Sequence, residues 1–555
     1  MTKFSNEWSR RKFLTSVGKL GGSLALYETM VAMGLVNLPT AWAGIPTMRP
    51  NQGEGKSVLI LGAGIGGLTA AFILSQYGYR CRILEATSRA GGRNHTARKG
   101  TMIVEESKAN GTTYQECMFD EGLYMNLGPG RLPYHHRRVL GYCQELNVAL
   151  QPYIMNTTGN LFQANGKFDS EAMVYRGIQH DTRGYISEML AKVVNKGLLD
   201  QPLDGNDKEN LLSLLKKFGA LNDELQYVGT TRDGCGPDPN DRPTPNVFYN
   251  CLDPLKTPWK ELLDSQFWNN SFYSPLEFEW QPTLFQPVGG MDMIVEGFLR
   301  KVGNLVEYNA PVSNIDIKDE CVKITIKQGS KNKSYEADYC ISNIPCSVLK
   351  DIPNNFTDKF ASAVKRTEFA DSCKVGWQCN TRFWENDQNE IYGGISWTDD
   401  MIEQIWYPSA DFFGQKGTLT GAYIHGKNAT AFGTYDLKKR LQIAKAGGAK
   451  MHKEFNDNSI VPSELGLSIA WQNIPYLKGA WPAWNETTQH DNNDYQTLLL
   501  PDKKRFFITG DQASTLPGWQ EGAMMSAEHV VELLAGLKPH VIPEGVRAPN
   551  TLKIT

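Results

Sequence analysis

The chain has 555 residues, of which 41% are hydrophobic and 21% are charged. This composition is typical of a globular protein, and the length predicts two or three domains, because one hydrophobic core rarely extends beyond about 250 to 300 residues. The formal net charge is -3. Nucleic acid and anionic membrane surfaces are therefore not expected as partners, since both attract basic proteins.

The first 43 residues contain the successive parts of an export signal. A twin-arginine motif lies in Ser9–Leu14, a weakly apolar run extends from Val17 to Leu38, and the small-residue site Ala41-Trp42-Ala43 follows. We expect cleavage after Ala43, transport of the folded protein by a twin-arginine translocase, and a periplasmic or secreted location in a bacterium. Charged residues interrupt the apolar run, so no stable membrane anchor is expected. A cytosolic amphipathic helix is the alternative.

The stretch Ser57–Arg93 predicts a dinucleotide-binding unit. An apolar run leads into Gly62-Ala63-Gly64-Ile65-Gly66-Gly67, and a helical pattern then continues to Tyr77. Glycines in this loop allow a tight turn and a close approach of the backbone to a pyrophosphate, whose charge the helix N-terminus favours. Glu85 ends the second strand, at the spacing of an acid that accepts hydrogen bonds from a ribose diol. A plain glycine-rich turn is the alternative.

The continuation of this stretch, from Glu85 to Arg93, resembles the extension by which the flavin amine oxidase family holds FAD. A second resemblance comprises the apolar strand Arg505–Asp511 and the segment Leu516–Ala527, which leads into a helix ending at Leu537. The resemblance implies an α/β fold: a Rossmann-type FAD-binding domain, a mixed-sheet substrate domain and a helical insertion. It implies non-covalent FAD, because no cysteine stands where a thioether to flavin would form. The residues implied to contact FAD are Gly62, Gly64, Gly66, Gly67, Glu85, Ala86, Arg89, Gly92, Arg93, Gly128, Pro129, Gly130, Arg131, Val312, Gly510, Asp511, Gly518, Trp519 and Gln520.

Arg131 is the residue that suggests a substrate. The segment Gly128–Pro133 resembles the part of L-amino-acid oxidases whose arginine grips the substrate carboxylate. A guanidinium offers a planar, bidentate fork to a carboxylate and stays charged when it is buried. Gly130 stands where many relatives carry methionine, which implies a more open pocket wall. A surface or structural ion-pairing arginine is the alternative.

Four further residues take roles from the same resemblance. Tyr407 matches a tyrosine that assists Arg131 with the carboxylate, although an ordinary core position is equally compatible. Gly518 matches the carbonyl that accepts the substrate amine. Trp519 matches an aromatic wall beside the substrate, with an exposed tryptophan in a turn as the alternative. Lys374 aligns with a lysine that reaches the flavin N5 edge through a water, so Lys374 and Trp519 are the implied catalytic residues. A half-exposed lysine at a sheet edge is the alternative.

The resemblance runs from about Val58 to Leu537 and predicts the domain boundaries. These are a signal peptide (1–43), FAD-binding segments (57–150, 282–345 and 481–537), a helical insertion (151–281), a substrate-binding domain (346–480) and a tail (538–555). The implied activity is that of an FAD-dependent L-amino-acid oxidase, which takes an amino acid and oxygen to a 2-oxo acid, ammonia and hydrogen peroxide by hydride transfer to FAD. A monoamine or polyamine oxidase, an amino-acid 2-monooxygenase that gives an amide, and a flavoprotein-like binding module without turnover are the alternatives. Neither the accepted side chain nor the oligomeric state can be inferred, and a homo-oligomer is compatible with the sequence.

Cysteine and histidine spacing predicts neither a disulfide framework nor a metal site. None of the ten cysteines forms a Cys-x-x-Cys pair, and several, such as Cys81, Cys340 and Cys346, lie in or near apolar strand-like runs. The nine histidines show no His-x-x-x-His spacing.

Overall fold

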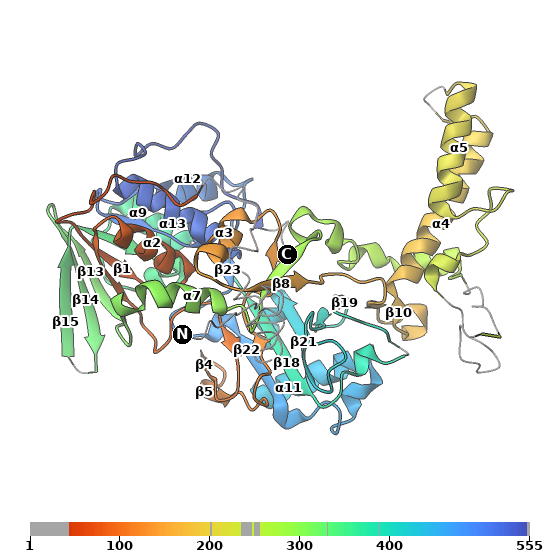
Figure 1. The fold of residues 1–555 in the computed structure, drawn as a ribbon, viewed down its shortest axis with the longest axis horizontal. Helices are drawn as coiled ribbons and strands as arrows, with labels where there is room; N and C mark the ends of the chain where they lie inside the picture. Colours follow the sequence, from red (N-terminus) through yellow and green to blue (C-terminus); the bar gives the residue numbers. More distant parts are fainter. Residues whose placement is uncertain are drawn as a thin grey trace, which may run out of the picture.

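The computed structural model describes residues 44–199, 203–234, 247–248, 256–329, 331–387 and 389–551. The predicted export signal lies outside the described residues. Two α/β bodies lie side by side, and a pair of helices projects away from them as an arm (Figure 1). No helix of the described part is long and apolar enough to cross a membrane.

The first body is built on a five-stranded sheet of wholly parallel strands. Strand β1 (Ser57–Leu61) lies at the centre of the sheet, whose strands come from both ends of the chain. In spatial order the strands are β12 (Val306–Glu307), β2 (Arg80–Leu84), β1, β16 (Tyr339–Ser342) and β24 (Phe506–Ile508). The carboxyl ends of such strands form the crevice where doubly wound folds bind dinucleotides.

Both faces of this sheet are covered, which explains why β1 is a continuous apolar run. Val58 and Ile60 pack into one core cluster, while Leu59 and Leu61 pack into another on the opposite face. The first cluster includes α2 (Ile65–Gln76), α7 (Met293–Val302) and α13 (Gln520–Leu534). The second includes β13 (Val312–Ile317), β14 (Val322–Gln328), β15 (Lys331–Ala337), α9 (Asp358–Arg366) and α12 (Gln489–Leu498).

The second body is built on a seven-stranded mixed sheet with β18 (Ser372–Cys379) inside it. Every residue of β18 is buried, because the antiparallel strands β21 and β22 flank it. In spatial order the strands are β10 (Met173–Val174), β9 (Leu161–Gln163), β19 (Ile395–Thr398), β20 (Gln404–Trp406), β21 (Gly417–His425), β18 and β22 (Gly466–Ala470). Helix α11 (Leu437–Gly448) contacts β18, β21 and β22.

A small three-stranded sheet is formed by strands β7 (Leu132–Pro133), β11 (Leu284–Pro287) and β8 (Leu150–Tyr153). Strand β11 lies between the other two, and both pairings are antiparallel. Leu284 pairs with Pro133 on one side and with Tyr153 on the other, so three segments that are distant in the sequence meet here. Apart from the two helices of the arm, the other α-helices and strands of the described part are β3 (Thr96–Ala97), β4 (Met102–Ser107), β5 (Gly111–Glu116), β6 (Met125–Asn126), α3 (Arg137–Glu145), α6 (Trp259–Ser265), α8 (Cys346–Leu349), β17 (Phe369–Ala370), α10 (Gly426–Phe432) and β23 (Trp481–Pro482).

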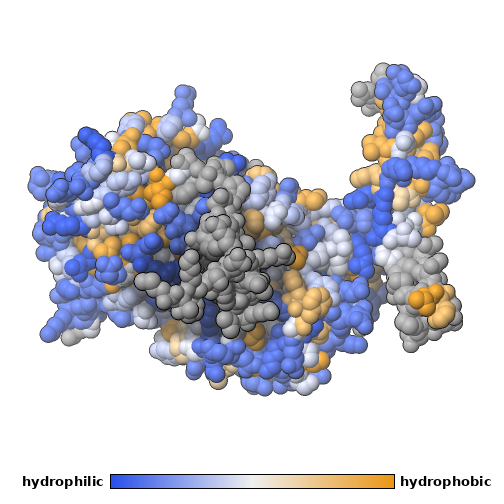
Figure 2. Space-filling view, in the orientation of Figure 1, coloured by the Kyte–Doolittle hydropathy of each residue, from blue (hydrophilic) through white to orange (hydrophobic). Residues whose placement is uncertain are grey.

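The arm consists of α4 (Tyr175–Asn195) and α5 (Gly205–Gly219). Helix α5 begins at Gly205, where the side chain of Asp204 caps its first turn. It ends at Gly219, because Ala220 adopts a left-handed conformation. The arm has a small core, and Leu214 and Phe218 remain 60% and 50% exposed. Figure 2 shows hydrophobic residues over its surface.

Two predicted boundaries differ from the structure. The range 151–281 was expected to be a helical insertion, and it contains α4, α5 and α6; it begins, however, with the end of β8 and with β9 and β10, and the last two pair within the seven-stranded sheet. The range 538–555 was expected to be a tail, yet Ala548 packs in the core beneath the parallel sheet and Thr551 bonds to Trp484. Both differences arise from long-range pairing, which local patterns do not report. The eight cysteines in the described ranges carry free thiols.

Candidate active site

A cavity of about 430 Å³ lies along the carboxyl edge of the parallel sheet and reaches β18 of the second body. We call it the large cavity. Most residues that the sequence singled out line it: Gly62, Gly64, Gly66, Glu85, Ala86, Arg89, Gly92, Arg93, Gly128, Pro129, Val312, Lys374, Gly510, Asp511, Gly518, Trp519 and Gln520. Gly67, Gly130, Arg131 and Tyr407 are not among its lining residues.

The glycine loop after β1 is closed by a side chain that the sequence did not single out. Gly62 has a φ of +96°, which favours glycine. A Cβ on Gly64 would lie 2.4 Å from Nδ2 of Asn343, and one on Gly66 would lie 2.6 Å from its Oδ1. A Cβ on Gly67 would lie 2.1 Å from the carbonyl oxygen of Gly62. Gly67 therefore serves the close packing of α2 against the loop, while the other two glycines face the cavity.

Glu85 holds a buried carboxylate at the end of β2. One of its oxygens accepts a hydrogen bond from the backbone N–H of Ala63 (2.8 Å). The other accepts from the backbone N–H (2.9 Å) and the hydroxyl (2.8 Å) of Thr87. A carboxylate has about four acceptor positions, so about one remains for a ligand hydroxyl.

Asp511 links the two ends of the chain across the large cavity. It forms an ion pair with Arg93 and accepts a hydrogen bond of 2.9 Å from the backbone N–H of Gly518. The resemblance implies that this acid contacts FAD, which stays a prediction, and Asp511 lines the large cavity. Its described contacts also fix the turn that carries Gly518 and Trp519 to the end of the cavity.

Lys374 lies in the buried strand β18, so the alternative of a half-exposed edge lysine does not apply. Its ammonium donates to the carbonyl oxygens of Gly128 (2.6 Å) and Asn126 (3.2 Å). No carboxylate in the described part forms an ion pair with it. Burial, together with the charge of Arg131, lowers the pKa of Lys374 to about 7. This amine can therefore hold or release a proton near neutral pH.

Arg131 is surrounded by three indole rings, which we call the tryptophan cage. Its guanidinium carbon lies 5.0 Å from the ring centroids of Trp280 and Trp406 and 5.7 Å from that of Trp519. Within the described part of the chain no carboxylate pairs with Arg131, and its buried Nε has no hydrogen-bond partner. Burial lowers its pKa, while the neighbouring Tyr153 and Tyr423 act in the opposite direction.

Two expectations at this end of the site differ from the structure. The hydroxyl of Tyr407 was expected to assist Arg131, but it is bonded to Ser396 Oγ (2.8 Å) and His452 Nε2 (2.6 Å) in the core. The tyrosine that neighbours Arg131 is Tyr153, because β8 and β7 both pair with β11. Its buried hydroxyl has no partner among the described residues.

Gly130 does not open the pocket wall as expected. A Cβ at this position would lie 2.5 Å from the ring of Trp406. The indole therefore fills the space that the missing side chain leaves. The absence of a side chain at Gly130 thus makes room for Trp406, which is one ring of the tryptophan cage. This packing could not be inferred from either residue alone.

Residues 65–535 match the model of a protein family described as flavin containing amine oxidoreductase. The chain belongs to this family. It is 23% identical over 498 residues to the flavin-dependent L-tryptophan oxidase RebO of Lentzea aerocolonigenes, with 85% of this chain and 96% of that protein covered. It is also 23% identical to an L-amino-acid oxidase of Notechis scutatus scutatus, with 85% of each chain covered.

Solved structures of amine oxidases share the fold. A putrescine oxidase mutant matches with a TM-score of 0.55 at 14% identity, covering 87% of this chain and 99% of that chain. Cyclohexylamine oxidase from Brevibacterium oxydans matches with a TM-score of 0.53 at 15% identity, covering 87% of this chain and 98% of that chain. The predicted flavin amine oxidase fold is therefore confirmed.

As a member of the flavin-containing amine oxidoreductases, the protein uses FAD, and the large cavity fits that cofactor. The glycine loop leaves no room for side chains where a pyrophosphate would approach, and Glu85 retains an acceptor position for a ribose hydroxyl. Helix α13 begins at Gln520 on the cavity wall, where its N-terminus favours negative charge. None of the described lining residues is a cysteine, and non-covalent binding stays a prediction.

Replacement of Gly67 by alanine is expected to leave the purified enzyme with little bound FAD. The added Cβ would overlap the carbonyl oxygen of Gly62, so α2 must move away from the glycine loop. The ratio of flavin to protein absorbance measures the loss. Gly177→Ala in α4 is the matched control, because a Cβ there meets nothing within 4 Å, and it should retain FAD. Equal flavin content in the two variants would contradict this role of Gly67.

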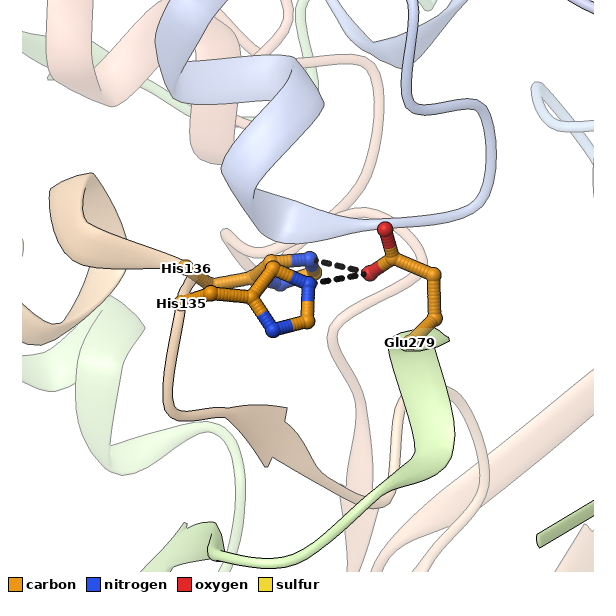
Figure 3. A group of neighbouring side chains, drawn as sticks. All are labelled: His135, His136 and Glu279. Atoms are coloured by element: carbon orange, nitrogen blue, oxygen red, sulfur yellow. Dashed lines mark hydrogen bonds and ion pairs between the residues drawn. The ribbon is translucent and has the colours of Figure 1, made fainter. Parts of the chain in front are cut away.

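Two histidines and a glutamate, which we call the His–Glu cluster, lie together (Figure 3), and one of them, His136, contacts the ring of Trp519. Glu279 Oε2 accepts hydrogen bonds from Nε2 of His135 (2.9 Å) and Nε2 of His136 (2.7 Å). These are atom types that metal ions bind, although histidine spacing predicted no such group. Spacing could not reveal it, because Glu279 is far from the two histidines in the sequence. The hydrogen bonds among the three side chains satisfy these atoms in the structure.

Proposed function

We propose that this flavin-containing amine oxidoreductase is an L-amino-acid oxidase that releases a 2-oxo acid, ammonia and hydrogen peroxide. The observation that carries the proposal is Arg131, a buried cation without a carboxylate partner in the described part of the chain, next to the substrate end of the large cavity. An unpaired buried charge is costly, so a protein that retains one needs an anion to meet it. The carboxylate of an amino acid supplies that anion.

Other residues support a substrate bound in one orientation. Arg131 and the free hydroxyl of Tyr153 would hold the carboxylate, and the carbonyl of Gly518 would accept the amine. Trp519 forms an apolar wall that limits the access of water. Lys374, with its pKa near 7, would hold or move a proton at the far side of the same space. When bound, FAD supplies the hydride acceptor.

An amine oxidase is the main competing function, since the structures that share the fold include putrescine and cyclohexylamine oxidases. A substrate without a carboxylate would leave Arg131 unpaired, which disfavours this alternative. An amino-acid 2-monooxygenase would use the same arginine and differs only in its product, an amide.

Peroxide release from each of the twenty L-amino acids, measured with the FAD-loaded enzyme, tests the proposal. At least one amino acid should give peroxide, ammonia and 2-oxo acid in equal amounts. Turnover confined to amines without a carboxylate would refute it. Formation of the amide in place of the 2-oxo acid would identify a monooxygenase.

We also propose that the enzyme is exported through the twin-arginine pathway. The support comes from the sequence alone: the arginine pair, the apolar run and the small-residue site occur in order within residues 1–43. The N-terminal sequence of protein recovered from outside the bacterial cytoplasm should begin after Ala43. An exported protein that retains Met1 would refute cleavage at this site.

A further inference from the structure

A single turn of 3-10 helix, η5 (Phe278–Trp280), contacts the substrate arginine and the residues that follow it. Phe278 stacks on the ring of His135, with centroids 4.2 Å apart. The next residue is the glutamate of the His–Glu cluster (Figure 3). The third, Trp280, covers the guanidinium of Arg131. All three consecutive side chains of η5 therefore contact the segment 131–136.

The sheet pairing explains why these two segments meet. Strand β11 follows η5 and pairs antiparallel with β7, which lies between Arg131 and the two histidines. The backbone N–H of Tyr134 extends this pairing with a hydrogen bond of 3.0 Å to the carbonyl of Thr283. An isolated turn of 3-10 helix is weak by itself, so side-chain contacts must hold η5 in place beyond the end of the strands.

The His–Glu cluster also reaches a second ring of the tryptophan cage. The ring of His136 meets Trp519 edge-on, with centroids 4.8 Å apart and an interplanar angle of 89°. Burial alone would raise the pKa of Glu279, but hydrogen bonds from His136 and His135 outweigh it and hold this pKa below its ordinary value. The ionised carboxylate of Glu279 therefore links two rings of the tryptophan cage. Trp280 is the next residue in the chain, and Trp519 contacts His136, which is hydrogen-bonded to Glu279.

Indole rings over a guanidinium contact its face and leave its N–H edge available. We propose that Glu279 is a positioning residue for substrate binding: through the His–Glu cluster it holds Trp280 against Arg131, which directs the N–H edge of the guanidinium toward the substrate carboxylate. This inference rests on the proposed function, because it assigns a carboxylate to Arg131. Glu279 itself touches neither the substrate nor the cofactor.

A comparison of two glutamates in the same segment tests the inference. Glu279→Gln removes the charge of the His–Glu cluster at constant size, and Glu277→Gln does the same two residues earlier, at an exposed carboxylate. For the best L-amino acid, Glu279→Gln should raise KM about tenfold and change kcat less than about twofold. The dissociation constant of benzoate, read from the absorbance of the FAD-loaded enzyme, should rise by the same factor. Glu277→Gln should change neither constant, and equal responses of the two variants would overturn the inference.

Substitutions of Trp280, alone and combined with Glu279→Gln, test whether Glu279 acts through the ring of Trp280. If Glu279 acts through Trp280, Trp280→Leu and the double variant with Glu279→Gln should have the same KM. A double variant whose KM rises by the product of the two single effects would overturn the inference. Trp280→Phe keeps an aromatic face and should recover part of the KM lost in Trp280→Leu. If Glu279→Gln does not retain FAD, the comparison of Trp280→Phe with Trp280→Leu replaces it. Equal KM values in these two variants would overturn the proposed role of the Trp280 ring.

The wild-type enzyme separates this inference from the proposed function. Oxidation of amines only, without benzoate binding, would refute the carboxylate site itself. Oxidation of L-amino acids and binding of benzoate, with Glu279→Gln indistinguishable from Glu277→Gln, would refute only the role of Glu279.

Discussion

Replacement of Arg131 by alanine is expected to raise KM for L-amino acids at least about 100-fold, which corresponds to about 2.7 kcal/mol of lost binding. The guanidinium lies within the tryptophan cage, and the described residues offer it no carboxylate, so the substrate would be its counter-ion. Arg131→Lys should give a smaller loss, because an ammonium keeps the charge but lacks the bidentate fork. Initial rates of peroxide release over a range of amino-acid concentrations measure both effects.

The matched control is a pair of substrates. The amine that lacks the carboxylate of the best amino acid cannot use Arg131, so any slow turnover of this amine should be unchanged or faster in Arg131→Ala. Unchanged KM for the amino acid, or an equal loss for both substrates, would contradict carboxylate binding by Arg131. Flavin content establishes that the variant retains its cofactor.

Replacement of Lys374 by methionine is expected to slow reoxidation of the reduced enzyme by oxygen about 100-fold at pH 6, since loss of one oriented charge or donor in a buried site typically costs about that much. The pKa of Lys374 is lowered from 10.5 to about 7 by burial and by Arg131. Below pH 7 the amine would be mostly charged and would stabilise negative charge that develops on oxygen; above pH 7 it would be mostly neutral. The rate constant of the wild-type enzyme should therefore fall as pH rises through about 7.

Stopped-flow measurement of the reoxidation rate constant from pH 5.5 to 8.5 checks this fall, which we call the pH step. Lys374→Met should have a low rate constant at every pH, without the pH step. Lys450→Met is the control, because Lys450 lies in the same body but is partly exposed and paired with Asp400 at 2.8 Å. It should keep the pH step. A step near pH 7 that persists in Lys374→Met would show that another group titrates there.

The cofactor site could be predicted because its elements are local. Gly62 to Gly67 and Glu85 belong to one strand–turn–helix–strand unit, in which spacing alone determines how the backbone meets a phosphate. The strand at Phe506–Ile508 was recognised from its own apolar run. Asn343 was missed, because an asparagine in a loop carries no pattern that separates a ligand contact from an ordinary turn.

The surroundings of the substrate arginine could not be predicted in the same way. Tyr407 was assigned to Arg131 by resemblance, but its hydroxyl is used by Ser396 and His452. Gly130 suggested open space, yet Trp406 fills it. A substitution in one strand is compensated by a residue from another, and no single segment records both changes.

The sequence by itself predicted a dinucleotide cradle from a short motif with local geometry, and its resemblance to flavin amine oxidases implied the fold class, FAD and an arginine suited to a carboxylate. The tertiary structure alone decided what surrounds that arginine: Trp280, Trp406 and Trp519 come from three separate elements, and the His–Glu cluster joins two of these rings. The pairing of β7 with β11 brings the segment of Arg131 and the segment of Trp280 together. Such contacts arise from strand register and side-chain packing over long sequence separations, which the order of residues within one segment does not encode.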